Sequence, residues 1–213
     1  MVFDIDLTKY KLVDLSWEVT PNAMPPDRPF DTREGRLGDG TLKYEITNTH
    51  THVGTHVESP LHFYFKGNTC TDYPLDKFMG KATLVTTDIP DCAPSVSLEH
   101  VKKQLEPRRG AFEIVYVRND TPRRPLYVDI ECVPYFAELN LKLFAFDSTI
   151  GIGRTPEDGR TFHDLLLSRD TLLVEFPANG QAIDRDLFYL FAMPLRIKDL
   201  DSSACRLFAV VER

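Results

Sequence analysis

Residues 50–62 constrain this chain more than any other segment, because they hold four of its six histidines. From residue 50 to residue 62, every even position is histidine, glycine, glutamate or proline, whereas the odd positions hold threonine, valine, serine and leucine. Alternate side chains of an extended chain lie on the same face. An extended segment would therefore place its imidazoles and the carboxylate of Glu58 on one side and its small or apolar residues on the other.

Three interpretations of this segment compete. The first is a surface strand whose histidines have no joint role. The second is the helical H-E-x-x-H zinc-protease motif, but Val53 stands where that motif needs its glutamate, and Pro60 would break the helix. The third is a metal site on extended or looped chain, because imidazole and carboxylate ligands suit Zn²⁺, Mn²⁺ or Fe²⁺. Four histidines and an acid in register favour the metal site.

A metal site requires the chain to bend between His52 and His56. A straight strand would separate these residues by ~13 Å, whereas each metal bond is only about 2 Å long. Gly54 lies midway between them, and glycine adopts a bend at the lowest steric cost. We therefore predict a bend at Gly54. Pro60 is expected to end the extended segment before His62, so that His62 takes a different role.

Three residues in the second half of the chain are further candidates. Glu175 lies within the apolar run 172–176, where a buried charge is costly unless it is paired or bound to a metal; a side chain pointing outward from a half-buried strand is the alternative. His163 is the only histidine in this half of the chain, and an ordinary structural or surface role is its alternative. Asp147 follows an apolar strand, where a capping or turn role is more typical.

Composition excludes several classes of protein. The chain is 42% hydrophobic and 27% charged, which is enough apolar material for a core and excludes a mainly disordered chain. Its net charge of −7 lacks the basic excess of nucleic-acid binders, so we expect no nucleic-acid partner. No apolar run approaches the ~20 residues that span a bilayer, and the N-terminus lacks signal-peptide features. The four cysteines are scattered, so we expect a cytoplasmic protein without a membrane partner.

The apolar pattern predicts more strands than helices, which favours an α/β domain with a mixed sheet flanked by helices. Residues 21–29 contain four prolines and are expected to be irregular, and Asp39-Gly40 is expected to form a turn. Strands are expected at 13–17, 42–51, 82–87, 112–117, 141–146, 172–176 and 207–211. Helices are expected at 97–105, 129–139 and 164–167. We expect a single domain over residues 1–213.

Residues 52–62 resemble the hallmark H-x-G-T-H-x-D-x-P-x-H of the cyclase family of metal-dependent hydrolases, which includes kynurenine formamidase and isatin hydrolase. His163 and Glu175 are twelve residues apart, as are the later histidine and glutamate of that family. Other segments of the chain also resemble the family: Asp14-Leu15-Ser16, and residues 76–80, 144–148 and 193–197. The resemblance implies a swivelling β/β/α-like fold.

The resemblance also implies site residues. His52 and His56 would bind one metal ion, Glu58 would bridge two, His163 and Glu175 would complete the second, and His62 would be the catalytic acid and base. One departure from the hallmark is that the bridging acid is usually aspartate, whereas here it is Glu58. Its extra methylene lengthens the arm by ~1.5 Å, so we expect either one or two divalent ions, Zn or Mn. His50 has no counterpart in the hallmark.

Such a site would suit an amidohydrolase. A divalent metal supplies hydroxide near neutral pH and polarises a carbonyl, and an imidazole accepts and returns the proton. We expect cleavage of an amide, formamide or small lactam in a small-molecule substrate. Six aromatic residues could line a pocket for an aromatic substrate, although core roles are the alternative: Trp17, Phe30, Phe63, Tyr64, Phe65 and Phe176.

Two other functions remain open from the sequence. One is a non-catalytic protein that binds a metal or small ligand on the same scaffold. The other is a lyase or cyclase in which the metal stabilises an enolate. The resemblance further implies a homo-oligomer, either a dimer or a tetramer.

Overall fold

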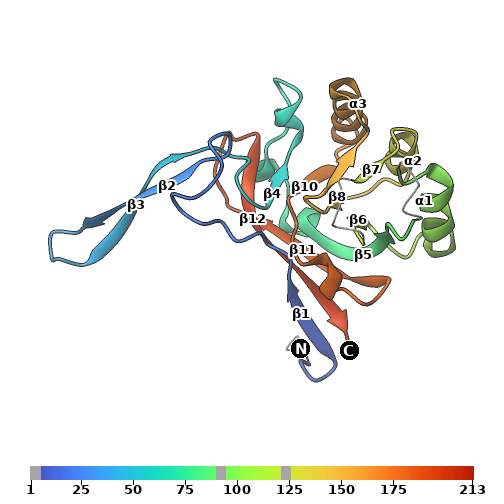
Figure 1. The fold of residues 1–213 in the computed structure, drawn as a ribbon, viewed down its shortest axis with the longest axis horizontal. Helices are drawn as coiled ribbons and strands as arrows, with labels where there is room; N and C mark the ends of the chain where they lie inside the picture. Colours follow the sequence, from blue (N-terminus) through green and yellow to red (C-terminus); the bar gives the residue numbers. More distant parts are fainter. Residues whose placement is uncertain (1–5, 90–94, 121–125) are drawn as a thin grey trace.

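The computed structural model describes residues 6–89, 95–120 and 126–213. Figure 1 shows a body built on a sheet, helices beside it and a long two-stranded arm. The described α-helices are α1 (Leu98–Leu105), α2 (Cys132–Glu138) and α3 (Pro156–Leu167). The described strands are β1 (Tyr10–Asp14), β2 (Phe30–Arg36), β3 (Leu42–Thr49), β4 (His56–Glu58), β5 (Met79–Thr86), β6 (Ile114–Arg118), β7 (Leu126–Val128), β8 (Leu143–Phe146), β9 (Ile150–Ile152), β10 (Leu172–Glu175), β11 (Leu187–Pro194) and β12 (Ser202–Glu212).

Seven strands of the main sheet close on themselves. Their order is β12-β11-β5-β6-β8-β10-β4, and β4 pairs back onto the first residues of β12. The neighbours β5, β6, β8 and β10 run parallel, whereas β4, β11 and β12 pair antiparallel with their neighbours. Strand β1 extends the sheet from the far part of β12. The expected α/β class with a mixed sheet is therefore confirmed.

Two apolar clusters occupy the two sides of the closed sheet, because successive side chains of a strand point to opposite faces. In β6, Val115 and Val117 belong to the cluster that includes residues of α1, α2 and α3. The intervening Ile114 and Tyr116 belong to the other cluster, which all seven strands supply. Both faces of the central parallel strands are therefore buried, as is usual for such strands.

The helices and strands that the sequence predicted differ from the observed ones mainly at their ends. Helix α1 begins after Ser97, whose side chain accepts a hydrogen bond from the His100 amide, as predicted. The short helix expected at 164–167 is the end of α3, which begins much earlier because Thr155 and Asp158 form a capping box around Pro156. Strands β2, β7, β9 and β11 were not predicted, although β11 is mostly apolar.

Residues 21–49 form an arm and its approach. Residues 21–29 contain neither helix nor strand, as predicted, and β2 and β3 form a hairpin that projects from the body (Figure 1). The turn at Asp39-Gly40 is confirmed. Cys70, Cys132 and Cys205 are free thiols, and Cys92 lies outside the described residues. None of the helices in the described part of the chain has the length and apolarity needed to cross a membrane.

Candidate metal centre

The predicted bend lies at Gly54, which adopts a φ of +66°. This left-handed conformation favours glycine, and a Cβ at this position would lie 2.5 Å from Cγ2 of Val19. After the bend, strand β4 runs between β10 and β12. Its antiparallel register with β10 places His56 directly opposite Glu175. A bend and one strand pairing therefore bring together residues that are far apart in the sequence.

The first half of the cluster consists of His52, His56 and Glu58. Nδ1 of His52 lies 3.2 Å from Nε2 of His56 and 3.0 Å from Oε1 of Glu58. Nε2 of His56 lies 3.6 Å from the same Oε1. These three atoms face one another closely enough to be ligands of one ion. Nε2 of His62 lies 3.7 Å from Oε1 of Glu58, so His62 also faces this group.

The second half of the cluster forms around the other oxygen of Glu58. Helix α3 places Nε2 of His163 3.3 Å from Oε2 of Glu58 and 4.0 Å from Oε1 of Glu175. Oε2 of Glu175 lies 3.8 Å from Nε2 of His56. The structure thus brings together the six residues to which the family resemblance assigns a role, and the carboxylate of Glu58 lies among them.

The carboxylate of Glu58 has the environment of a metal ligand. Its side chain is 3% exposed, and its Oε2 is buried without a hydrogen bond from any described group. Burial favours a raised pKa for Glu58, but His163, His52 and His56 outweigh this effect and hold the pKa well below its usual range. Burial and the charge of Glu58 raise the pKa of Glu175. A buried orphan oxygen beside three imidazoles and a second carboxylate fits a divalent cation.

Backbone carbonyls fix the orientation of two imidazoles. Nδ1 of His56 lies 2.8 Å from the carbonyl oxygen of Gly54, and Nδ1 of His163 lies 2.6 Å from that of Gly159. Each contact assigns the proton to Nδ1 and leaves Nε2 as the lone-pair nitrogen that faces the glutamates. Metal-binding histidines are commonly held in this way by a hydrogen bond from their other nitrogen.

Asp201 is a functional candidate that the sequence did not indicate. Its Oδ2 lies 2.9 Å from Nε2 of His52 and 3.1 Å from Nδ1 of His62, and its Oδ1 accepts a hydrogen bond from Thr51. Asp201 therefore contacts both a candidate ligand and the candidate acid–base residue. Its two histidine partners are 149 and 139 residues away in sequence, so no local pattern marks it.

Charges around Asp201 shift two pKa values strongly. Burial alone would lower the pKa of His52, but hydrogen bonds with Glu58 and Asp201 raise it to about 9. Burial alone would raise the pKa of Asp201, but hydrogen bonds from His52, His62 and Thr51 lower it to about 2. The protein without a metal therefore holds a proton on His52 where a metal would bind.

Aromatic side chains flank both halves of the cluster. Phe63 stacks against His163 at a centroid distance of 6.2 Å, and Phe176 stacks against His56 at 5.8 Å. Trp17 stacks on the Phe176 ring. Of the other three predicted pocket residues, Phe30 begins β2 and Phe65 is 93% exposed, whereas Tyr64 packs edge-on against Phe63 and bonds through its hydroxyl to Asp164.

Two remaining candidates do not join the cluster. His50 is exposed, with its Nε2 3.0 Å from the carbonyl of Asp27. Asp147 is buried elsewhere, where it accepts hydrogen bonds from the Tyr116 hydroxyl and the Asn119 amide. Burial raises the pKa of Asp147 to about 6. Asp147 therefore fixes the end of β8, in agreement with the turn role considered from the sequence.

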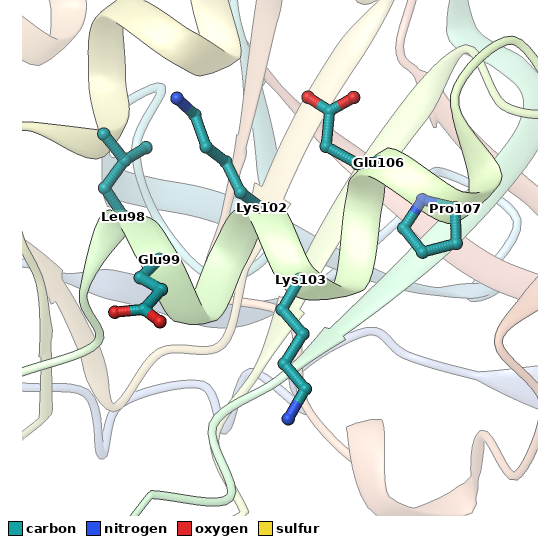
Figure 2. Close-up of a pocket in the computed structure, with 6 residues that line it drawn as sticks. All are labelled: Leu98, Glu99, Lys102, Lys103, Glu106 and Pro107. Atoms are coloured by element: carbon teal, nitrogen blue, oxygen red, sulfur yellow. The ribbon is translucent and has the colours of Figure 1, made fainter.

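A hollow of about 600 Å³ lies on the outer surface of α1, away from β4 and β10. Figure 2 shows that its side chains point in different directions and do not converge on a common point. They are Leu98, Glu99, Lys102, Lys103, Glu106 and Pro107. The hollow does not add to the histidine–glutamate cluster.

Known proteins resemble this chain in sequence. The model of the Cyclase family matches residues 13–150. Kynurenine formamidase of Salinibacter ruber is 35% identical over 95 residues, which cover 42% of this chain and 44% of that protein. Kynurenine formamidase of Delftia acidovorans is 26% identical over 207 residues, which cover 89% of this chain and 94% of that protein.

Solved structures share the fold. Isatin hydrolase A from Labrenzia aggregata, bound to benzyl benzoate, superimposes with a TM-score of 0.76 at 18% identity. The superposition covers 96% of this chain and 94% of that one. The family match spans more than half of the chain and includes the bend, β4 and His62. This chain therefore belongs to the Cyclase family.

Proposed function

We propose that this chain is a metal-dependent amidohydrolase that cleaves a C–N bond in an amide, formamide or small lactam, and that residues 1–213 act as one domain. The observation that carries the proposal is the convergence of four histidines on the carboxylate of Glu58, with Glu175 facing two of them. The names of the relatives support the same class of reaction, because kynurenine formamidase and isatin hydrolase both act on C–N bonds.

The proposed ligands are His52, His56 and Glu58 for one divalent ion, with His163 and Glu175 completing a second. Zn²⁺ and Mn²⁺ both suit this mixture of imidazole and carboxylate. When bound, a divalent metal lowers the pKa of water and polarises a carbonyl oxygen. The two oxygens of Glu58 face different imidazoles, which supports a bridging role despite its extra methylene.

His62 is proposed to move the proton. Its Nδ1 lies 3.1 Å from Oδ2 of Asp201, which orients the ring, and its Nε2 faces the carboxylate of Glu58. Nε2 of His62 would accept a proton from the attacking water and then return it to the leaving nitrogen. An imidazole held by a carboxylate on one side and open to the site on the other is suited to both transfers.

The substrate is proposed to be a small molecule with an aromatic group. Phe63 stacks against His163 and Phe176 against His56, and Trp17 adds a partly exposed ring beside Phe176. Flat aromatic side chains beside a reactive centre favour a flat, apolar substrate group. This supports aryl formamides and isatin-like lactams as the first compounds to test.

The protein is also proposed to be a homodimer. Leu42, Tyr44 and Ile46 lie on one face of β3 and are 48%, 62% and 59% exposed. An isolated two-stranded hairpin is marginally stable in water, so a second copy of the chain would bury this apolar row. The cytoplasmic location expected from the sequence stays a prediction.

Hydrolysis by the metal-loaded protein tests the proposal. Wild type should release product from formanilide or isatin, whereas His62→Ala should keep its metal and lose turnover by about 100-fold or more. His100→Ala is the matched control, because His100 bonds to a backbone carbonyl outside the cluster. The proposal is wrong if wild type binds metal but hydrolyses no formamide or lactam, which would favour the binding-protein alternative. A product formed by elimination would instead favour the lyase alternative.

A further inference from the structure

Arg28 belongs to the proline-rich approach to the arm, yet it lies beside the metal centre. Its Nη1 donates a hydrogen bond of 3.1 Å to the backbone carbonyl of His52. Its guanidinium carbon lies 4.1 Å above the ring centroid of Phe176. Phe176 directly follows Glu175 and stacks against His56. The His52 carbonyl and the Phe176 ring therefore hold the guanidinium at the rim of the cluster.

The guanidinium of Arg28 has no acidic partner among the described residues. Three described arginines are half-buried, namely Arg28, Arg108 and Arg118. Arg118 pairs with an aspartate at 2.6 Å and Arg108 with another at 3.9 Å. No described carboxylate lies within 4.0 Å of Arg28. One hydrogen bond occupies one of the five N–H donors of a guanidinium.

A half-buried charge without a counter-ion is unfavourable unless something else compensates it. The ring of Phe176 offers part of this compensation through a cation–π contact, which leaves the edge of the guanidinium available. That edge matches a carboxylate, because its parallel N–H groups donate two hydrogen bonds in the plane of the anion. One guanidinium also balances the single charge of a carboxylate, whereas a phosphate carries more charge and needs more donors.

We propose that Arg28 binds a carboxylate group of the substrate and thereby selects anionic aromatic amides over neutral ones. This inference rests on the proposed function, because it names the substrate class of the same site. The aromatic body of the substrate would lie between the rings that flank the cluster. Its carboxylate would lie at the rim beside Phe176, and the scissile carbonyl would face the histidines.

The kinetic test compares two formamides that differ by one carboxylate, 2-formamidobenzoate and formanilide. The quantity of interest is the ratio of their kcat/KM values in wild type and in Arg28→Gln, which keeps one N–H donor for the His52 carbonyl but removes the charge. We expect the preference for the anionic substrate to fall about tenfold or more in Arg28→Gln, chiefly through KM. Arg28→Lys should retain part of the preference. Arg36→Gln, an exposed variant on the same arm, should keep the wild-type ratio.

A binding test separates this inference from the proposed function. Calorimetry would compare anthranilate with neutral 2-aminobenzamide on the metal-loaded wild type and Arg28→Gln proteins. Weaker anthranilate binding in Arg28→Gln, with little change for the amide, would support the inference even if wild type hydrolysed neither formamide. Equal changes for both compounds, or no change for either, would overturn it and leave Arg28 as a residue that holds the arm. If the inference about Arg28 fails, the proposed function can still be tested by hydrolysis of neutral formamides.

Discussion

At the scale of single residues, the sequence indicates a functional role for Glu58 but not for Asp201. Glu58 is predictable because its partners His52 and His56 lie within six residues and share its alternation. Asp201 lies 149 and 139 residues from its histidine partners in sequence, and the pairing of β12 with β4 brings it to His52 and His62. Residues that act across long sequence distances leave no local pattern, which is why this half of the hydrogen-bond network was missed.

Asp201→Asn should weaken metal binding. The carboxylate holds Nε2 of His52 and so orients the nitrogen that faces Glu58. Loss of such an outer partner commonly weakens metal affinity by about 10- to 100-fold. Competition with a chelating dye would measure the change, and Asp199→Asn is the control because the Asp199 side chain is 77% exposed. Unchanged affinity in Asp201→Asn would contradict the positioning role of this carboxylate.

Metal binding should become tighter as the pH rises towards 9. The pKa of His52 is raised from 6.5 to about 9 in the metal-free protein. Below that pH the metal must displace a proton, so affinity should rise by up to about tenfold per pH unit and then level off. The raised pKa of His52 also contributes to the free energy of unfolding of the metal-free protein. This contribution is fully present below pH 6.5 and is lost as the pH rises through 9. Calorimetry in buffers of different ionisation enthalpy would count the protons released, and release of none at pH 7.5 would contradict this account.

At the scale of elements, the helices and strands that could be predicted are those that a local sequence pattern marks. The apolar runs of β6, β8 and β10 and the capped start of α1 were predicted within three residues at each end. Strand β4 has three residues and depends on its neighbours for pairing, so its sequence alone cannot define it. The start of α3 was missed because Pro156 and Gly159 obscured a capping box.

Gly54→Ala should disturb both the fold and the metal centre. The position has a φ of +66°, and an added Cβ would lie 2.5 Å from Val19, so the bend between His52 and His56 would have to change. We expect a loss of about 1–3 kcal/mol in the free energy of unfolding, together with weaker metal binding. Gly38→Ala is the control, since a Cβ there meets nothing within 4 Å. Equal stabilities of the two variants in urea would contradict the requirement for glycine at the bend.

At the scale of the whole molecule, closure of the sheet assembles the site. Strand β4 pairs with both β10 and β12, so the histidine segment, Glu175 and Asp201 meet although they come from distant parts of the chain. The sequence predicted the mixed sheet but not its closure, because closure depends on the unpredicted strand β11 and on pairings of high sequence separation. The projecting hairpin in Figure 1 is the other feature that belongs to this scale.

Ile46→Asp should convert the proposed dimer into a monomer. Ile46 is 59% exposed within the apolar row of β3, and a charge there would not be buried against a second copy. Light scattering coupled to size-exclusion chromatography would give the mass of each species. Thr47→Asp is the control, because the exposed Thr47 follows Ile46 outside that row. A wild-type protein that is monomeric at high concentration would contradict the proposed dimer.

The central claim is that the histidine–glutamate cluster binds divalent metal. Elemental mass spectrometry on protein purified without chelators or a histidine tag measures the metal content per chain. The account predicts one or two Zn or Mn ions in wild type, a loss in His52→Ala, and wild-type content in His100→Ala, with circular dichroism confirming that each variant is folded. Two ions would support bridging by Glu58, and one would indicate a mononuclear centre. No bound metal in folded wild type, even after incubation with Zn²⁺ and Mn²⁺, would contradict the account.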